Sequence, residues 1–132
     1  MSRAQAPILL DTCIWIDALR GRSTSVVATA RRWLDEGLVV RCDVVTAELR
    51  YGLRPHERER VLPLLDAVPN LPVTSDDWSA AADLGAELRA TGVTLPLTDL
   101  LVARVCLRSG ARLCTTDGHF DDIPSIVRCA AD

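Results

Sequence analysis

The feature that most constrains the fold is a regular alternation of short apolar runs with longer segments of helical pattern. The runs, at residues 7–10, 38–42, 71–73 and 111–115, have the length of strands, and apolar side chains recur at helical spacing between them. Strands that alternate with helices in this way pair in parallel through right-handed crossovers. The sequence therefore predicts a three-layer α/β/α sandwich with a mainly parallel sheet of four to five strands, the fifth at residues 126–127.

Length and composition set the class of protein. A chain of 132 residues predicts a single domain over residues 1–132, and with 48% hydrophobic but only 4% aromatic residues its core must be aliphatic. The net charge of −3 argues against charge-driven binding of a long polyanion, although it does not exclude nucleic acid. All 15 basic residues are Arg, which excludes lysine-dependent mechanisms such as the P-loop and the Schiff base.

The cysteines and the apolar runs predict where the protein resides. The five cysteines form no CxxC pair, and Cys13, Cys106 and Cys114 lie within apolar segments, so we expect buried free thiols in a reducing compartment. No charged leader precedes an apolar core at the N-terminus, and the apolar runs are far too short to span a bilayer. These patterns predict a soluble cytoplasmic protein without a membrane segment.

Helix boundaries are predicted from capping residues and helix breakers. The predicted N-caps are Ser23 or Thr24, Asp43, and Ser75 or Asp76. Pro63 is expected to kink or restart a helix over residues 54–68. The helix after the third strand is expected to turn an inward stripe of Trp78, Ala81, Gly85 and Leu88 towards the core.

Four acidic residues stand where strands end or helices begin. Asp11 and Asp117 follow the first and fourth predicted strands, and Asp99 opens an apolar helix. Glu48 lies three and four residues after Val45 and Val44, which predicts that it faces inward. Each acid also has a simpler explanation: Asp11 as a helix cap, Asp99 as a first-turn acid, and Asp117 as part of an Asp-Gly turn. The carboxyl ends of parallel strands share one edge of the sheet, so we expect all four to converge there.

Four carboxylates in one cleft predict a particular chemistry. Like charges brought together in a partly dry site are unfavourable unless a cation joins them or some acids stay protonated. Oxygen ligands without an adjacent His or Cys suit Mg²⁺ or Mn²⁺, which also bind phosphate. The pattern therefore indicates metal-dependent phosphodiester chemistry, in which a bound cation polarises the phosphate and activates water.

The same residues resemble the motifs of a known family, the PIN-domain ribonucleases and specifically the VapC-like toxins of toxin–antitoxin pairs. The opening motif is DTCIWID at residues 11–17, and VTAEL at residues 45–49 is similar to the segment that carries the family's glutamate. LPLTDLLVA at residues 95–103 is similar to the segment of its third acid, and TTDGHF at residues 115–120 resembles its closing motif. The resemblance spans nearly the whole chain.

The resemblance implies a function and a set of roles. It implies that Asp11, Glu48, Asp99 and Asp117 hold Mg²⁺ or Mn²⁺ and carry the catalysis, with Thr12 and Thr116 as supporting hydroxyls. It further implies an RNA substrate, a homodimer, and inhibition by a VapB-like antitoxin. Two positions depart from the family pattern, since Cys13 stands where Ser is common and His119 where many relatives place another Asp. Asp121 is therefore an alternative to Asp117 as the fourth ligand.

Other readings of the sequence predict different activities. A cysteine nucleophile would pair Cys13 with His56 or His119, but no local signature joins them. An Asp-nucleophile phosphatase needs a second acid at the position of Cys13 and a lysine, which the chain lacks. A non-catalytic acidic pocket for an Arg-bearing partner would bind without cleaving RNA. Four arginines of one segment are candidates for RNA or partner contacts, or form a solvated helix face: Arg50, Arg54, Arg58 and Arg60.

Overall fold

A computed structural model describes residues 6–22, 24–123 and 125–129 of the chain. Its strands form one parallel sheet in the order β3-β2-β1-β4. The strands are β1 (Ile8–Leu10), β2 (Val39–Cys42), β3 (Asn70–Leu71) and β4 (Arg112–Cys114). The predicted α/β class and parallel pairing are thus confirmed.

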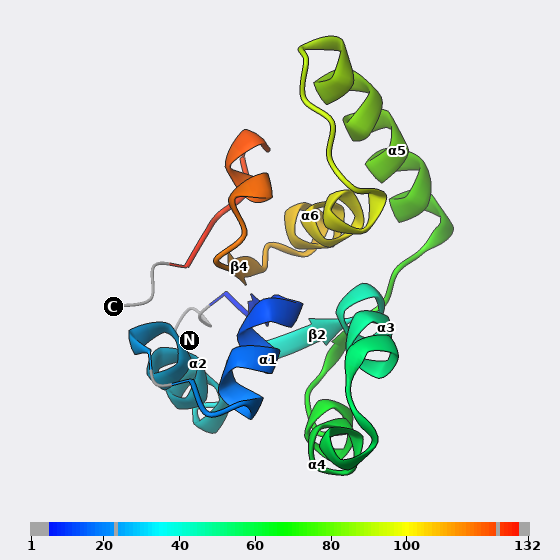
Figure 1. Ribbon diagram of the computed structural model, residues 1–132. Helices are drawn as coiled ribbons and strands as arrows, with labels where there is room; N and C mark the ends of the chain where they lie inside the picture. The colour runs from blue at the N-terminus through cyan, green and yellow to red at the C-terminus, as the bar shows by residue number, and fades with distance from the viewer. Residues whose placement is uncertain (1–5, 23, 124, 130–132) are drawn as a thin grey trace, which may run out of the picture.

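The helices cover both faces of this sheet. They are α1 (Thr12–Leu19), α2 (Ser25–Asp35), α3 (Asp43–Gly52), α4 (Pro55–Asp66), α5 (Ser75–Ala90), α6 (Leu97–Ser109) and the short 3-10 helix η1 (Gly118–Asp122). In Figure 1, α5 and α6 lie on one side of the sheet, and α1, α2 and α4 on the other. The chain steps from β1 to β2 to β3 in one direction and then returns to β4, so right-handed crossovers place the last two helices on the opposite face. The strand order therefore reverses between β1 and β4, the position where open α/β sheets form their sites.

The core is aliphatic, as the composition predicts. The central strand β1 is entirely buried, and Val45, Leu101 and Leu113 are almost completely excluded from solvent. All five cysteines are free and four are buried, while Cys13 is only partly buried. None of the helices in the described part of the chain has the length and apolar character that a membrane crossing requires.

The third strand and the start of α3 differ from expectation for one shared reason. Cys42, not Asp43, is the N-cap of α3. The Asp43 carboxylate instead accepts hydrogen bonds from Asn70 Nδ2 at 3.1 Å and from the backbone N–H of Val73 at 3.0 Å. Because Asp43 takes this N–H, the strand predicted at residues 71–73 ends at Leu71.

Other predicted helix boundaries are corrected or confirmed by side-chain hydrogen bonds. Thr24 Oγ1 accepts from Val27 N at 3.1 Å and caps α2, whereas the alternative cap Ser23 lies outside the described residues. Thr74 caps α5, so the prediction of Ser75 or Asp76 is wrong. The helix α4 runs continuously through Pro63 and does not restart there.

The buried stripe of α5 contains an acid where a tryptophan was expected. Trp78 is 51% exposed, while Asp77 beside it is fully buried and Ala81 continues the inward face. Asp77 Oδ1 accepts from Arg104 Nε at 3.0 Å and Arg108 Nε at 2.8 Å. A buried carboxylate is tolerated because these guanidinium groups of α6 meet it. This network joins α5 to α6 and holds the pKa of Asp77 well below its usual range, chiefly through the hydrogen bonds from Arg108.

The expected fifth strand is reduced to one bridge. Residues 126–127 are not a strand among the described residues, and the only pairing is an isolated parallel bridge between Leu113 and Arg128. Leu113 N donates to Val127 O at 2.8 Å, and Cys129 N donates to Leu113 O at the same distance. The backbone of this segment therefore pairs with the outer edge of β4 at a single residue.

Candidate metal site

Asp11 occupies the centre of the rim where β1 and β4 end. Its backbone N–H donates to Cys114 O at 3.0 Å, which extends the pairing of the two strands by one step. Its side chain caps α1, since Oδ1 accepts from Thr12 N at 2.9 Å. Oδ2 accepts from Thr115 Oγ1 at 2.7 Å. Two elements therefore fix the orientation of this carboxylate.

The electrostatic environment of Asp11 disfavours its charge. The residue is only 8% exposed, and burial raises its pKa. The hydrogen bonds from Thr115 and Thr12 offset part of this effect, whereas the nearby charges of Asp99 and Asp117 add to it. The pKa of Asp11 lies above its ordinary value as a result, so an additional cation would stabilise the ionised form.

Glu48 reaches the same rim from α3. Its Oε1 accepts a hydrogen bond from Thr12 Oγ1 at 3.0 Å, which is the contact expected of a supporting hydroxyl. Glu48 is exposed to solvent, so the expectation of an inward-facing carboxylate is wrong. Partial desolvation and the charges of Asp11 and Asp99 nevertheless raise its pKa. Glu48 therefore belongs to the same group of mutually repelling acids.

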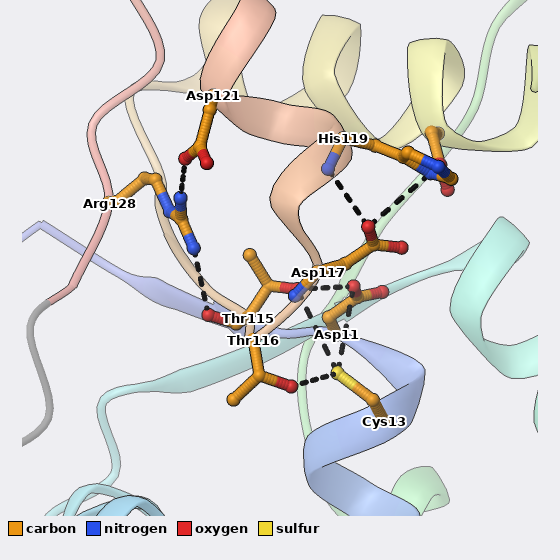
Figure 2. A network of polar contacts seen from close by, with 9 residues as sticks. Asp11, Cys13, Thr115, Thr116, Asp117, His119, Asp121 and Arg128 are labelled. Atoms are coloured by element: carbon orange, nitrogen blue, oxygen red, sulfur yellow. Dashed lines mark hydrogen bonds and ion pairs between the residues drawn. The ribbon is translucent and has the colours of Figure 1, made fainter. Parts of the chain in front are cut away.

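Asp99 and Asp117 face each other across an imidazole. Asp99 lies in the first turn of α6, and Asp117 precedes η1, where its Oδ1 accepts from the backbone N–H of His119 at 2.9 Å. His119 Nδ1 lies 2.7 Å from Asp99 Oδ2 and 3.3 Å from Asp117 Oδ1. Figure 2 shows His119 turned towards Asp117, with Asp11 below them. One ligand atom from each of Asp99, Asp117 and His119 lies within 4.8 Å of the other two.

Asp121 points away from this cluster. Its carboxylate forms an ion pair with Arg128 Nη1, and Arg128 Nη2 also donates to Thr115 O at 3.1 Å. Figure 2 shows Asp121 and Arg128 on the side of the loop opposite to Asp117. The geometry thus groups Asp117, and not Asp121, with Asp11.

Hydroxyl and thiol groups connect the acids at the base of the site. Thr116 Oγ1 donates to Cys13 Sγ at 3.5 Å, so Thr116 reaches the acids only through the thiol. Cys13 Sγ in turn lies 3.9 Å from Asp11 Oδ2. Thr115, which sequence reasoning did not select, makes the closest contact to Asp11 and also accepts from Asp117 N at 3.0 Å. The sequence signal for this role is that Thr115 opens the TTDGHF segment at the end of the fourth predicted strand.

A cavity opens beside the acidic cluster. It has a volume of about 420 Å³ and lies between α3, α5 and α6, with Glu48 at its border. Its other lining residues are Asp43, Val44, Ala47, Val73, Trp78, Thr98 and Leu101. The exposed indole of Trp78 offers a flat apolar face within reach of the site. The four arginines singled out in the sequence do not line this cavity: Arg50 lies on α3, Arg54 precedes α4, and Arg58 and Arg60 lie on α4. Arg58 donates a hydrogen bond to the Arg50 carbonyl.

Comparison with known proteins identifies similar chains. The family model described as PIN domain matches residues 8–126. The chain is 30% identical over 129 residues to VapC ribonuclease Mb1587 from Mycobacterium bovis and to Ribonuclease VapC11 from Mycobacterium tuberculosis, covering 94% of this chain and 96% of each relative. It is also similar to VapBC2 from Rickettsia felis, solved bound to a promoter DNA fragment, with a TM-score of 0.79 and 21% identity over 95% of this chain and 98% of that one.

Proposed function

Because this chain belongs to the PIN-domain family and is a ribonuclease of the VapC type, we propose that Asp11, Glu48, Asp99 and Asp117 form its active site. The observation that carries this proposal is the convergence of four carboxylates from separate elements on one rim, where burial, together with the charges of the neighbouring acids, raises the pKa of Asp11 and Glu48. The role of the four acids in RNA hydrolysis is inferred from this geometry together with the family.

The site fits a divalent cation. Every arginine ion pair among the described residues involves a carboxylate outside this group of four. None of the four acids is therefore neutralised by one of these arginines. In the described part of the chain, His119 is therefore the basic side chain that pairs with these acids, through Asp99 and Asp117. Carboxylate oxygens in this number suit Mg²⁺ or Mn²⁺, which we propose as the cofactor. Asp11, Asp99 and Asp117 would hold the ion, with Glu48 at the border of the site.

Different residues would orient the carboxylates, bind the ion and accommodate the nucleotide during hydrolysis. Thr115 and the first turn of α1 hold the Asp11 carboxylate in one orientation, and Thr12 does the same for Glu48. A divalent ion bound there would polarise the scissile phosphate and lower the pKa of an attacking water. The cavity beside Glu48 leaves room for a nucleotide next to the acids, with the Trp78 indole available for stacking.

The proposed biological role is that of a toxin restrained by a VapB-like antitoxin. Several similar solved structures are described as VapBC or toxin–antitoxin complexes, among them VapBC-5 from Mycobacterium tuberculosis, which is 26% identical over 95% of this chain and 100% of that one, with a TM-score of 0.63. Exposed apolar side chains such as Tyr51, Leu64 and Trp78 provide contact surface for an antitoxin and for a second copy in a homodimer. We propose that the protein acts in the cytoplasm, where cellular RNA is available as substrate.

Induction of the protein alone tests this function. RNA from cells that express the wild type is expected to carry new ends at a restricted set of positions, and co-expression of the cognate antitoxin should remove them. Sequencing of RNA ends measures both results. A non-catalytic module that captures an Arg-bearing partner would bind that partner without producing any new ends.

Removal of divalent ions is expected to stop RNA cleavage. Without a cation the four carboxylates repel both one another and the phosphate, and Mg²⁺ or Mn²⁺ should restore activity because both match oxygen ligands. Cleavage of a labelled RNA before and after treatment with EDTA measures the effect. Undiminished cleavage in excess EDTA by a preparation whose Asp11→Asn counterpart is inactive would contradict a metal mechanism.

Replacement of Asp117 and of Asp121 should separate the two candidates for the fourth ligand. We expect Asp117→Asn to lower kcat at least about a hundredfold, equivalent to roughly 3 kcal/mol of transition-state stabilisation. Asp121→Asn is the matched control, and it should change kcat much less because its carboxylate pairs with Arg128. An inactive Asp121→Asn together with an active Asp117→Asn would reverse the assignment.

A further inference from the structure

His119 brings a nitrogen atom into a candidate metal site whose other ligands are carboxylate oxygens. The chain has two histidines, and this one lies at the start of η1 with half of its side chain exposed. Its Nδ1 is directed at two proposed metal ligands, 2.7 Å from Asp99 Oδ2 and 3.3 Å from Asp117 Oδ1. Figure 2 shows the ring reaching over Asp117 from the η1 side. Among the described residues, His119 supplies the nitrogen donor of this cluster, and Asp99 and Asp117 supply oxygen donors.

The three donor atoms have the spacing that one ion requires. In an octahedral complex with bonds of about 2.1 Å, adjacent ligand atoms lie roughly 3 Å apart. The separations of 2.7 and 3.3 Å from His119 Nδ1 bracket this value, and all three donors lie within 4.8 Å of one another. The group therefore needs little rearrangement to share one ion. Asp121 does not compete for this position, because Arg128 holds it outside the cluster.

The chemical nature of the third donor determines which ion the group favours. Mg²⁺ prefers oxygen ligands, whereas an imidazole nitrogen binds first-row transition ions more strongly. A set of two carboxylates and one neutral imidazole therefore discriminates against Mg²⁺ and in favour of Mn²⁺ or Co²⁺. The discrimination comes from the nitrogen atom, because the two carboxylates serve either class of ion.

We propose that His119 is a ligand of the divalent ion beside Asp99 and Asp117, and that it makes this site selective for Mn²⁺ over Mg²⁺. The inference rests on the proposed function, since it takes Asp99 and Asp117 as metal ligands. The alternative is that His119 only pairs with the two acids while no ion is bound. The two roles predict opposite effects: loss of a ligand lowers the affinity for Mn²⁺, whereas loss of a competing partner raises the affinity for both ions.

Metal binding to the purified protein tests the proposal without measuring cleavage. Isothermal titration calorimetry should show tighter binding of Mn²⁺ than of Mg²⁺ by the wild type. His119→Ala should weaken Mn²⁺ binding at least about tenfold, since loss of even an outer partner of a metal ligand costs about 10–100-fold in affinity. The same substitution should leave Mg²⁺ binding nearly unchanged. His56→Ala is the matched control, because His56 is exposed on α4 and should affect neither ion.

Pulsed electron paramagnetic resonance of the Mn²⁺ complex identifies the ligand directly. The wild type and His56→Ala should show coupling of Mn²⁺ to ¹⁴N, and His119→Ala should lose it. A wild-type complex without nitrogen coupling, or a His119→Ala variant that binds Mn²⁺ as tightly as the wild type or more so, overturns the assignment of His119. Failure of the wild type to bind any divalent ion overturns the metal site of the proposed function as well, so the two failures are distinguishable.

Discussion

Asp11→Asn is expected to abolish RNA cleavage while stabilising the protein in the absence of metal. The substitution keeps the shape of the side chain and removes the charge at the centre of the cluster. Loss of a central metal ligand should lower kcat by at least about a thousandfold, or roughly 4 kcal/mol in the activation barrier. Cleavage of a labelled RNA and thermal unfolding in EDTA measure the two effects on the same preparation.

The expected gain in stability of the Asp11→Asn variant depends on pH. Folding raises the pKa of Asp11, so the ionised carboxylate lowers stability above its folded-state pKa and has no such effect below its unfolded-state pKa. Asp11→Asn should therefore have a higher Tm than the wild type near pH 7, and the difference should vanish as the pH falls below about 4. Added Mg²⁺ or Mn²⁺ should raise the Tm of the wild type more than that of the variant, because the variant lacks one of the proposed ligands.

Asp17→Asn is the matched control for these experiments. Asp17 lies on the same helix α1, but its carboxylate pairs with Arg22 at 2.8 Å and does not reach the cluster. This variant should cleave RNA like the wild type and should gain no stability in EDTA. Full cleavage by a folded Asp11→Asn variant would remove Asp11 from the active site.

Asp77→Ala is expected to cause the largest loss of stability. The substitution leaves the guanidinium groups of Arg104 and Arg108 without their shared carboxylate and removes the acceptor for Thr74 N. Breaking a buried ion pair from one side costs about 3–5 kcal/mol, and we expect about 3 kcal/mol because both arginines are one-third exposed. Urea unfolding of the wild type and the variant measures the difference.

The pH dependence and a neighbouring residue provide controls for the Asp77 prediction. Folding lowers the pKa of Asp77, so its contribution is complete above the ordinary carboxyl pKa of about 4 and declines as the pH falls below that value. The difference between the wild type and Asp77→Ala should shrink accordingly. Asp76→Ala, one residue earlier and exposed, should cost far less. Equal losses from the two variants would show that the ion pairs do not hold α5 against α6.

The parts of the fold that follow from local pattern could be predicted from the sequence. The strands at the centre of the sheet are buried on both faces, and their continuous apolar runs mark them clearly. The third strand was predicted to end two residues too late, because its end depends on a hydrogen bond from Val73 to Asp43, which is distant in the sequence. The two apolar residues at 126–127 gave a strand-like signal, but they meet the sheet only through one bridge.

The same distinction between local and distant contacts applies to side chains. Helical periodicity cannot distinguish Trp78 from Asp77 as the inward residue, because the choice is made by two arginines on another helix. The sequence placed Asp11 at the rim of the sheet because its position follows from where β1 ends. It gave Glu48 an inward direction that the structure does not have, and it missed Thr115, whose contact with Asp11 spans 104 positions.

The short edges of the sheet restrict how two copies of this protein can associate. At one edge, β3 is only two residues long and is followed by Pro72, which has no N–H to donate. At the other edge, residues 127–129 already occupy the backbone N–H and C=O of Leu113. Neither edge offers a row of free backbone groups to a neighbouring strand. A homodimer of the expected kind would therefore form through helix surfaces, which leaves the strand order of each subunit unchanged.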